Sequence, residues 1–181
     1  MVPANPKANG QVEVRNTFIT LNEMWKRMDA IGRAPYIEAV RGRPLTARNR
    51  HIQENLKQLR DDEEITEYTF SVASGQGLPP ASVTIVAGAG QINVNSLLPG
   101  TPPISYSFSM RYAGALLYGD PTDAIIRPMH TIESAHESSN LVIDGLTAGT
   151  YVCGCWIGWK RDSDDRIHYG PQVAGRTINV T

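Results

Sequence analysis

The sequence predicts a mainly β protein, in which a β-sandwich follows a short helical region. From about Tyr68 onward, short runs of β-branched and aromatic residues are separated by Gly, Pro, Asn and Asp clusters, roughly every 8 to 12 residues. Before that point, apolar residues recur with helical spacing instead. The chain is 41% apolar and 19% charged with a formal net charge of −1, which is typical of a globular protein with a packed core.

The first residues predict an arm and then a helix. Residues 1–15 contain prolines and few large apolar groups, so we expect them to be extended. Thr20 and Glu23 form a capping box, after which apolar residues recur at helical spacing until Gly32. The stripe consists of Leu21, Met24, Trp25, Met28 and Ile31. We expect it to pack on another subunit or on the rest of the chain.

A second helix is expected over Thr46–Asp62, after a link over residues 32–44 that is rich in helix breakers. Residues 41–60 hold a single acid, Glu54, and six basic residues, which are Arg41, Arg43, Arg48, Arg50, Lys57 and Arg60. Such a segment fits a solvated helix face, and it also fits a surface for an acidic partner or a nucleic acid. The solvated face is the favoured interpretation.

The remaining residues predict eight strands. They are Tyr68–Ala73, Ser82–Ala87, Gln91–Asn95, Ile104–Tyr112, Ile125–Ile132, Asn140–Ile143, Thr150–Trp159 and Val173–Val180. Alternation is clearest in the fourth, where Tyr106, Phe108, Met110 and Tyr112 share one face and serines occupy the other. We expect one core face and one polar face there.

The stretch LVIDGLTAGTYV, residues 141–152, resembles strand E, the turn and strand F of fibronectin type III and related immunoglobulin-like domains. Residues 91–95 and 102–108 resemble strand B, a proline-rich turn and strand C, so the resemblance covers roughly residues 82–181. It implies that Tyr151 forms a tyrosine corner after Leu146, and that residues 160–166 form the F–G hairpin. It also implies an adhesion, spacer or decoration module without catalytic machinery.

The sequence contains no recognisable catalytic, cofactor or metal motif. The four histidines lack zinc-site spacing, and the acidic loop over residues 160–166 lacks the glycine of a calcium loop. Cys153 and Cys155 stand two apart, too far for an unstrained disulfide within one strand, so we expect free and mostly buried thiols. We therefore expect a non-enzymatic protein without cofactors.

The sequence also bears on location and on domain organisation. No apolar run approaches the roughly 18 residues of a membrane span, and the N-terminus lacks the apolar region of a signal peptide. We expect a virion or, failing that, a cytoplasmic location. The expected division is an arm (1–15), a helical anchoring region (16–66) and a sandwich (67–181).

These patterns predict a structural module that anchors to a scaffold or to other subunits, with homo-oligomers expected. The anchor candidates are Leu21, Met24, Trp25, Met28, Arg41, Arg43, Arg48 and Arg50. A second contact surface is expected at the F–G loop tip, with Trp159, Arg161, Asp164 and Tyr169. The arrangement is similar to phage head-decoration, fibre and tail proteins, which often join an anchoring region to an immunoglobulin-like domain. The alternatives are a module that binds surface glycans and, less favoured, a nucleic-acid-binding protein that uses residues 41–60.

Overall fold

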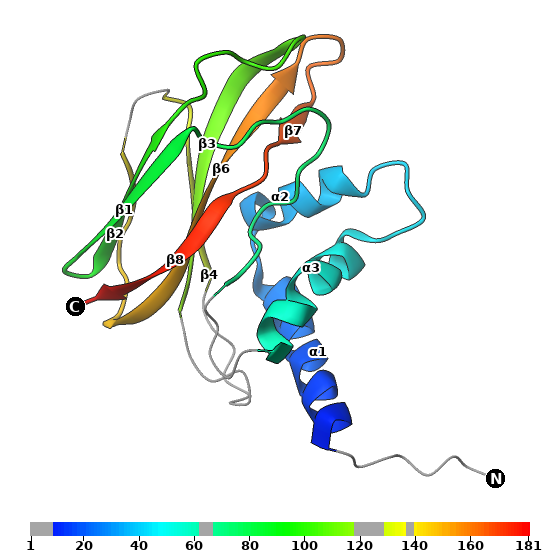
Figure 1. Cartoon of the computed structure of the whole chain (residues 1–181), viewed down its shortest axis with the longest axis vertical. Coiled ribbons are helices and arrows are strands. Elements are labelled where there is room, and N and C mark those ends of the chain that lie inside the picture. Colours follow the sequence, from blue (N-terminus) through cyan, green and yellow to red (C-terminus); the bar gives the residue numbers. More distant parts are fainter. Residues whose placement is uncertain (1–8, 62–66, 118–128, 137–139) are drawn as a thin grey trace.

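The computed structural model describes residues 9–61, 67–117, 129–136 and 140–181. It is a mainly β structure, in which two antiparallel sheets form a sandwich and three described helices cover one side of it (Figure 1). The helices are α1 (Asn9–Arg27), α2 (Ala30–Ala39) and α3 (Ala47–Asp61). The strands are β1 (Ser82–Gly88), β2 (Gln91–Leu97), β3 (Tyr106–Leu117), β4 (Met129–Ser134), β5 (Leu141–Ile143), β6 (Gly149–Arg161), β7 (Ile167–Tyr169) and β8 (Val173–Val180).

The strand order is that of an immunoglobulin-like sandwich. One sheet has the order β1-β2-β5, and the other has the order β4-β3-β6-β7, with β8 also paired to β6. The segments that resemble strands B and E, β2 and β5, are neighbours in the first sheet. Those that resemble strands C and F, β3 and β6, are neighbours in the second. Because immunoglobulin-like domains pair their strands in this way, the predicted fold class is confirmed.

The sandwich core is formed by small and medium-sized side chains between the two sheets. Tyr151, Cys153 and Cys155 of β6 pack there with Ala113 and Ala115 of β3. The first sheet contributes Ile92, Val94, Leu141 and Ile143. Both cysteines are free and buried, as expected, and burial raises the pKa of the Cys153 thiol to about 12. These thiols are therefore core residues rather than reactive groups.

The opposite face of β3 and β6 forms a second core with the helices. Val152 and Trp156 of β6 are fully buried in a cluster that includes Leu21 and Met24 of α1 and Ile52 of α3. Strand β6 is thus buried on both faces, as the helices in Figure 1 lie over the β4-β3-β6-β7 sheet. The chain therefore has three layers, and the helices supply one wall of a core.

This third layer corrects the expectation of one core face and one polar face in β3. Tyr112 does lie in a core, but in the core beneath the helices, while Ala113 and Ala115 on the other face fill the sandwich. The alternation is also interrupted, because a register shift between Phe108 and Met110 inserts a bulge opposite β6. Local sequence alternation could not reveal that both faces are covered.

The N-terminal elements differ from the expected ones. Helix α1 begins at Asn9, so residues 9–15 are helical rather than extended, and the capping-box residue Thr20 lies inside the helix. Residues 32–39 of the expected link belong to α2, which begins at Ala30 and contains Pro35. Asp29 caps α2 by accepting a hydrogen bond from the Gly32 backbone nitrogen at 2.7 Å. Burial of one face of α2 outweighs its poor local helix propensity.

The expected strand Tyr68–Ala73 is not a strand, because side chains take the place of a neighbouring strand. Gln172 accepts a hydrogen bond from the Phe70 nitrogen at 2.5 Å and donates one to the Tyr68 carbonyl at 2.7 Å. Asn55 of α3 accepts one from the Thr69 nitrogen at 2.8 Å. Two side-chain amides therefore satisfy the backbone nitrogens of residues 69–71 and the carbonyl of Tyr68, without a sheet ladder.

The other strands agree with the sequence to within a few residues, with two qualifications. Strand β7 was not expected, because its three residues are too few to show a period. The strand expected over Ile125–Ile132 is seen as β4 from Met129, and residues 125–128 lie outside the described residues.

Phe70 fixes the extended segment on the sheet. Its ring lies over Gly114 of β3 and Gly154 of β6, which are cross-strand partners. A Cβ atom at either glycine would come within 2.6 Å of a ring carbon of Phe70. The same ring is stacked near Trp156, with 6.0 Å between centroids. Two adjacent glycines are therefore required for this aromatic ring to reach the sheet.

We predict that Gly154→Ala lowers the free energy of unfolding by about 1 to 3 kcal/mol, because the added methyl group overpacks the Phe70 contact. Gly100→Ala is the control, since a Cβ there meets no atom within 4 Å. Urea denaturation of both variants measures the difference. Equal stability of Gly154→Ala and the wild type would contradict this packing.

A buried polar cluster joins α2 and α3 to the extended segment. The His51 Nε2 lies 2.6 Å from the Tyr68 hydroxyl, and the Asn55 amide donates to the Tyr36 hydroxyl at 3.2 Å. The Tyr36 hydroxyl in turn donates to the Thr69 carbonyl. Burial lowers the pKa of His51 to about 4, so its imidazole is neutral in the folded chain at pH 7.

This depressed pKa predicts acid sensitivity. In the unfolded chain His51 binds a proton near pH 6.5, whereas the folded chain resists protonation until about pH 4. The unfolded state therefore holds more protons in this window, and stability falls as the pH falls through it. We expect protonation linked to His51 alone to lower the free energy of unfolding by about 2 kcal/mol between pH 7 and pH 5.

Urea denaturation of wild type and His51→Phe at both pH values measures this contribution, because phenylalanine keeps a ring but cannot be protonated. The variant should lose correspondingly less stability on acidification than the wild type. His136→Phe serves as the control, since His136 is exposed. An identical pH dependence in wild type and His51→Phe would rule out the assignment.

Candidate functional site

The apolar anchor candidates lie inside the protein. Leu21, Met24 and Met28 are each at most 5% exposed and pack within the chain. Trp25 is half-buried, with its ring centroid 6.0 Å from that of Tyr36. The prediction that these side chains bind a partner is therefore wrong for the three buried residues, because this chain's own sheet and helices cover the stripe.

The exposed apolar groups of α1 lie in its first half instead. Residues 10–16 are all exposed, and in Figure 1 this half of α1 extends beyond the rest of the molecule. The large apolar side chains that are at least 36% exposed there are Val12, Val14, Phe18 and Ile19. The expected arm over residues 1–15 and the expected capping box at Thr20 both leave these four side chains outside the predicted helix.

The basic candidates separate into two groups. Arg48 donates to the Asn22 side chain of α1 at 2.6 Å and so ties α3 to α1, whereas Arg50 pairs with Glu54 within α3 at 2.6 Å. Arg41 and Arg43 lie in the loop after α2, away from that helix face. The segment over residues 41–60 is therefore not one continuous basic surface.

The four loop-tip candidates differ in whether they are buried in the core or lie in the hairpin. Trp159 and Tyr169 are 1% and 7% exposed, which contradicts their prediction as contact residues. The Trp159 indole donates to the Leu78 carbonyl at 2.9 Å. Arg161 and Asp164 do lie in the β6–β7 hairpin, where the Arg161 Nε donates to Asp164 at 2.9 Å. Ion pairing with Arg161 lowers the pKa of Asp164 to about 2.

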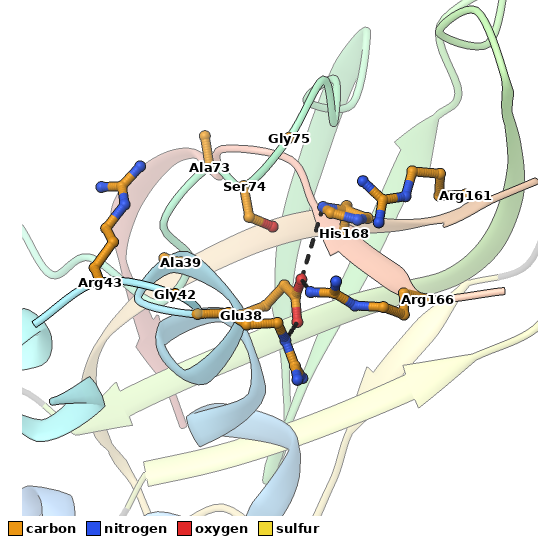
Figure 2. A pocket seen from close by; sticks show the side chains of 11 residues that line it. Glu38, Ala39, Gly42, Arg43, Ala73, Ser74, Gly75, Arg161, Arg166 and His168 are labelled. Atoms are coloured by element: carbon orange, nitrogen blue, oxygen red, sulfur yellow. Dashed lines mark hydrogen bonds and ion pairs between the residues drawn. The ribbon is translucent and has the colours of Figure 1, made fainter. Parts of the chain in front are cut away.

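The fold brings the arginines of the loop after α2, Arg41 and Arg43, together with those of the β6–β7 hairpin, Arg161 and Arg166. They line a hollow of about 500 Å³. It lies between the loop after α2, the loop over residues 73–75 and the β6–β7 hairpin (Figure 2). Its lining residues are Glu38, Ala39, Arg41, Gly42, Arg43, Ala73, Ser74, Gly75, Arg161, Arg166 and His168. We call this hollow the arginine pocket. Sequence spacing gave no sign that residues near 41 and 161 would meet.

Glu38 organises the arginine pocket from α2. Its side chain is 8% exposed and accepts a hydrogen bond from the Arg41 Nε at 2.9 Å. Arg166, from the end of the hairpin, pairs with the same carboxylate. Figure 2 shows the Arg166 side chain beside the Glu38 carboxylate. One buried carboxylate thus fixes two guanidinium groups from segments far apart in the sequence.

His168 lies across the pocket from Glu38. Its Nδ1 is 3.9 Å from the Glu38 carboxylate, too far for a hydrogen bond, and its side chain is 8% exposed. Burial lowers the pKa of His168, although Glu38 acts in the opposite direction. Neither ring nitrogen has a hydrogen-bond partner among the described residues, and the Arg166 Nε is also buried without one.

The arginine pocket is electropositive. Its lining holds four arginines and one carboxylate, Glu38, and the hairpin carboxylate Asp164 pairs with Arg161 and Arg166. The Ser74 hydroxyl accepts a hydrogen bond from the Tyr169 nitrogen at 2.8 Å. No group of three possible metal ligands occurs within the described residues. The arrangement is suited to holding an anion.

The corner residues lie where the family resemblance implies. The Tyr151 hydroxyl donates to the Thr147 carbonyl at 3.0 Å, four residues upstream. The Leu146 nitrogen donates to the Gly90 carbonyl at 2.9 Å, which ties the turn to the β1–β2 hairpin. Both residues are buried, so they stabilise the sandwich rather than contact a ligand.

No protein-family model and no curated protein matches the chain. Among solved structures, the alpha chain of the chicken interferon gamma receptor is similar at 14% sequence identity, with a TM-score of 0.40. The alignment covers 57% of this chain and 52% of the receptor chain. Within the described residues, no helix has the length and apolar character needed to cross a membrane.

We predict that Glu38→Gln destabilises the fold by about 1 to 2 kcal/mol, because it leaves Arg41 and Arg166 without their shared carboxylate. Glu23→Gln removes a surface pair with Lys26 and should cost less than about 0.5 kcal/mol. Thermal and urea denaturation compare the two. Equal losses would contradict the organising role of Glu38.

Proposed function

We propose that the chain is a non-enzymatic structural module, which joins an assembly through helix α1 and displays an immunoglobulin-like domain. The observation that carries the proposal is the exposed first half of α1. A helical segment without tertiary contacts is marginally stable in water, because helix stability in proteins comes mainly from packing. A partner that covers this half would supply the missing packing.

The occupant that fits best is a second copy of the chain. Val12 and Ile19 stand seven residues apart, the spacing of equivalent positions in a coiled-coil seam, and both are exposed. Val14 and Phe18, four residues apart, line the neighbouring side of the helix. A symmetric pair of helices would bury the same residues in both copies, so it requires no further complementary surface.

The other sequence-based functions have less support. Glycan-binding modules use exposed aromatic platforms, whereas Trp156, Trp159 and Tyr169 are buried here. Nucleic-acid binding by α3 would compete with the contacts that already engage Arg48 and Arg50. A virion location stays a prediction from the sequence, because a helix that mediates assembly does not distinguish a virion from any other complex.

Light scattering over a concentration series tests the proposal. We expect the full chain to form dimers or larger oligomers, and Ile19→Gln to weaken association about 100-fold, because each copy loses a buried aliphatic side chain. The matched control is Val86→Gln on the β1-β2-β5 sheet, since Val86 and Ile19 are both 53% exposed.

Two outcomes would contradict self-assembly through α1. One is a monomer at every concentration, which would exclude a second copy as the occupant. The other is an oligomer that Val86→Gln weakens and Ile19→Gln does not, which would place the interface on the sandwich.

A further inference from the structure

The arginine pocket contains buried polar groups that the described residues leave without a hydrogen-bond partner. Buried polar groups normally have hydrogen-bond partners, and those without one often mark a ligand site. The Arg166 Nε and both nitrogens of the His168 ring lack partners among the described residues. His168 is more than nine-tenths buried, and its Nδ1 is directed across the pocket toward Glu38 in Figure 2. Three of the buried polar atoms without a partner therefore belong to residues that line this one hollow.

Two further arginines can reach a ligand in this hollow. Arg41 uses its Nε for Glu38, and its terminal nitrogens form no ion pair within the described residues. Arg43 forms no side-chain ion pair within that same part of the chain, and its guanidinium is exposed. Because Glu38 already holds Arg41 in place, part of the entropy of ordering that side chain has been lost before a ligand arrives.

The charge of the pocket selects among anions. The excess of arginines over carboxylates in the lining favours a phosphate group, which carries about −1.5 to −2 at pH 7, over a singly charged carboxylate. Guanidinium forks also hold phosphate oxygens in pairs, with stronger hydrogen bonds than neutral donors form.

We propose that the arginine pocket binds a phosphate group, either as the free ion or as a monoester, through Arg41 and Arg43, with Arg166 and His168 as its floor. The mouth of the pocket is formed by the loop after α2 and the β6–β7 hairpin, so the ligand ties the helical layer to the sandwich. This site is separate from the assembling half of α1, and neither proposal depends on the other.

Isothermal titration calorimetry of the full chain at pH 7.5 and low ionic strength tests the site with inorganic phosphate, phenyl phosphate and acetate. We expect saturable binding of both phosphates at one site per chain, and binding of acetate at least about tenfold weaker. Tighter binding of phenyl phosphate than of inorganic phosphate would support a monoester as the ligand, and equal binding would support the free ion.

Arg43→Gln should weaken phosphate binding about tenfold, because it removes one charged hydrogen-bond donor. Its matched control is Arg27→Gln at the end of α1, which changes the net charge equally on an exposed residue outside the pocket. Arg43 makes no side-chain ion pair within the described residues, so its variant should keep the wild-type melting temperature. The proposal is overturned by acetate binding as tightly as phosphate, by no saturable phosphate binding up to about 10 mM, or by equal effects of the two variants.

Discussion

The contact of Phe70 with Gly114 and Gly154 is the constraint on which the rest of the structure depends. It seats the segment after the helices directly on the sheet, so that Gln172 and Asn55 can satisfy its backbone. The same segment carries the hydrogen-bonded cluster beneath α2 and α3, and it continues into the loop over residues 73–75. That loop is one wall of the arginine pocket. Packing at two glycines thus positions the segment that both the helical layer and the pocket contact.

The sandwich could be predicted because its determinants are local in the sequence. Turn residues at regular intervals marked most of the strands, and the sequence around Tyr151 carried the turn between strands E and F. The second helix was also placed within one residue at each end, since a hydroxyl N-cap and the spacing of its apolar residues are local signals.

The helical layer and the site could not be predicted, because both depend on contacts between distant residues. The stripe of Leu21 and Met24 looked like a docking face, and no local pattern shows that Trp156 would cover it. Arg41 and Arg161 were each singled out, but that both line one pocket follows only from the packing of α2 on the sheet. The expected division into an anchoring region and a separate sandwich domain depends on the same packing. Val152 and Trp156 of β6 would be exposed without the helices.

Hydrogen exchange of the full chain, followed by mass spectrometry, tests this three-layer account most directly. Because α1 after Leu21, α3 and β6 share one core, their amides should exchange through a common global opening with similar protection, while residues 9–16 exchange faster in the monomer. Strong protection of β6 together with rapid exchange throughout α3 and residues 21–27 would show that the helices are a separable region, and would contradict the account.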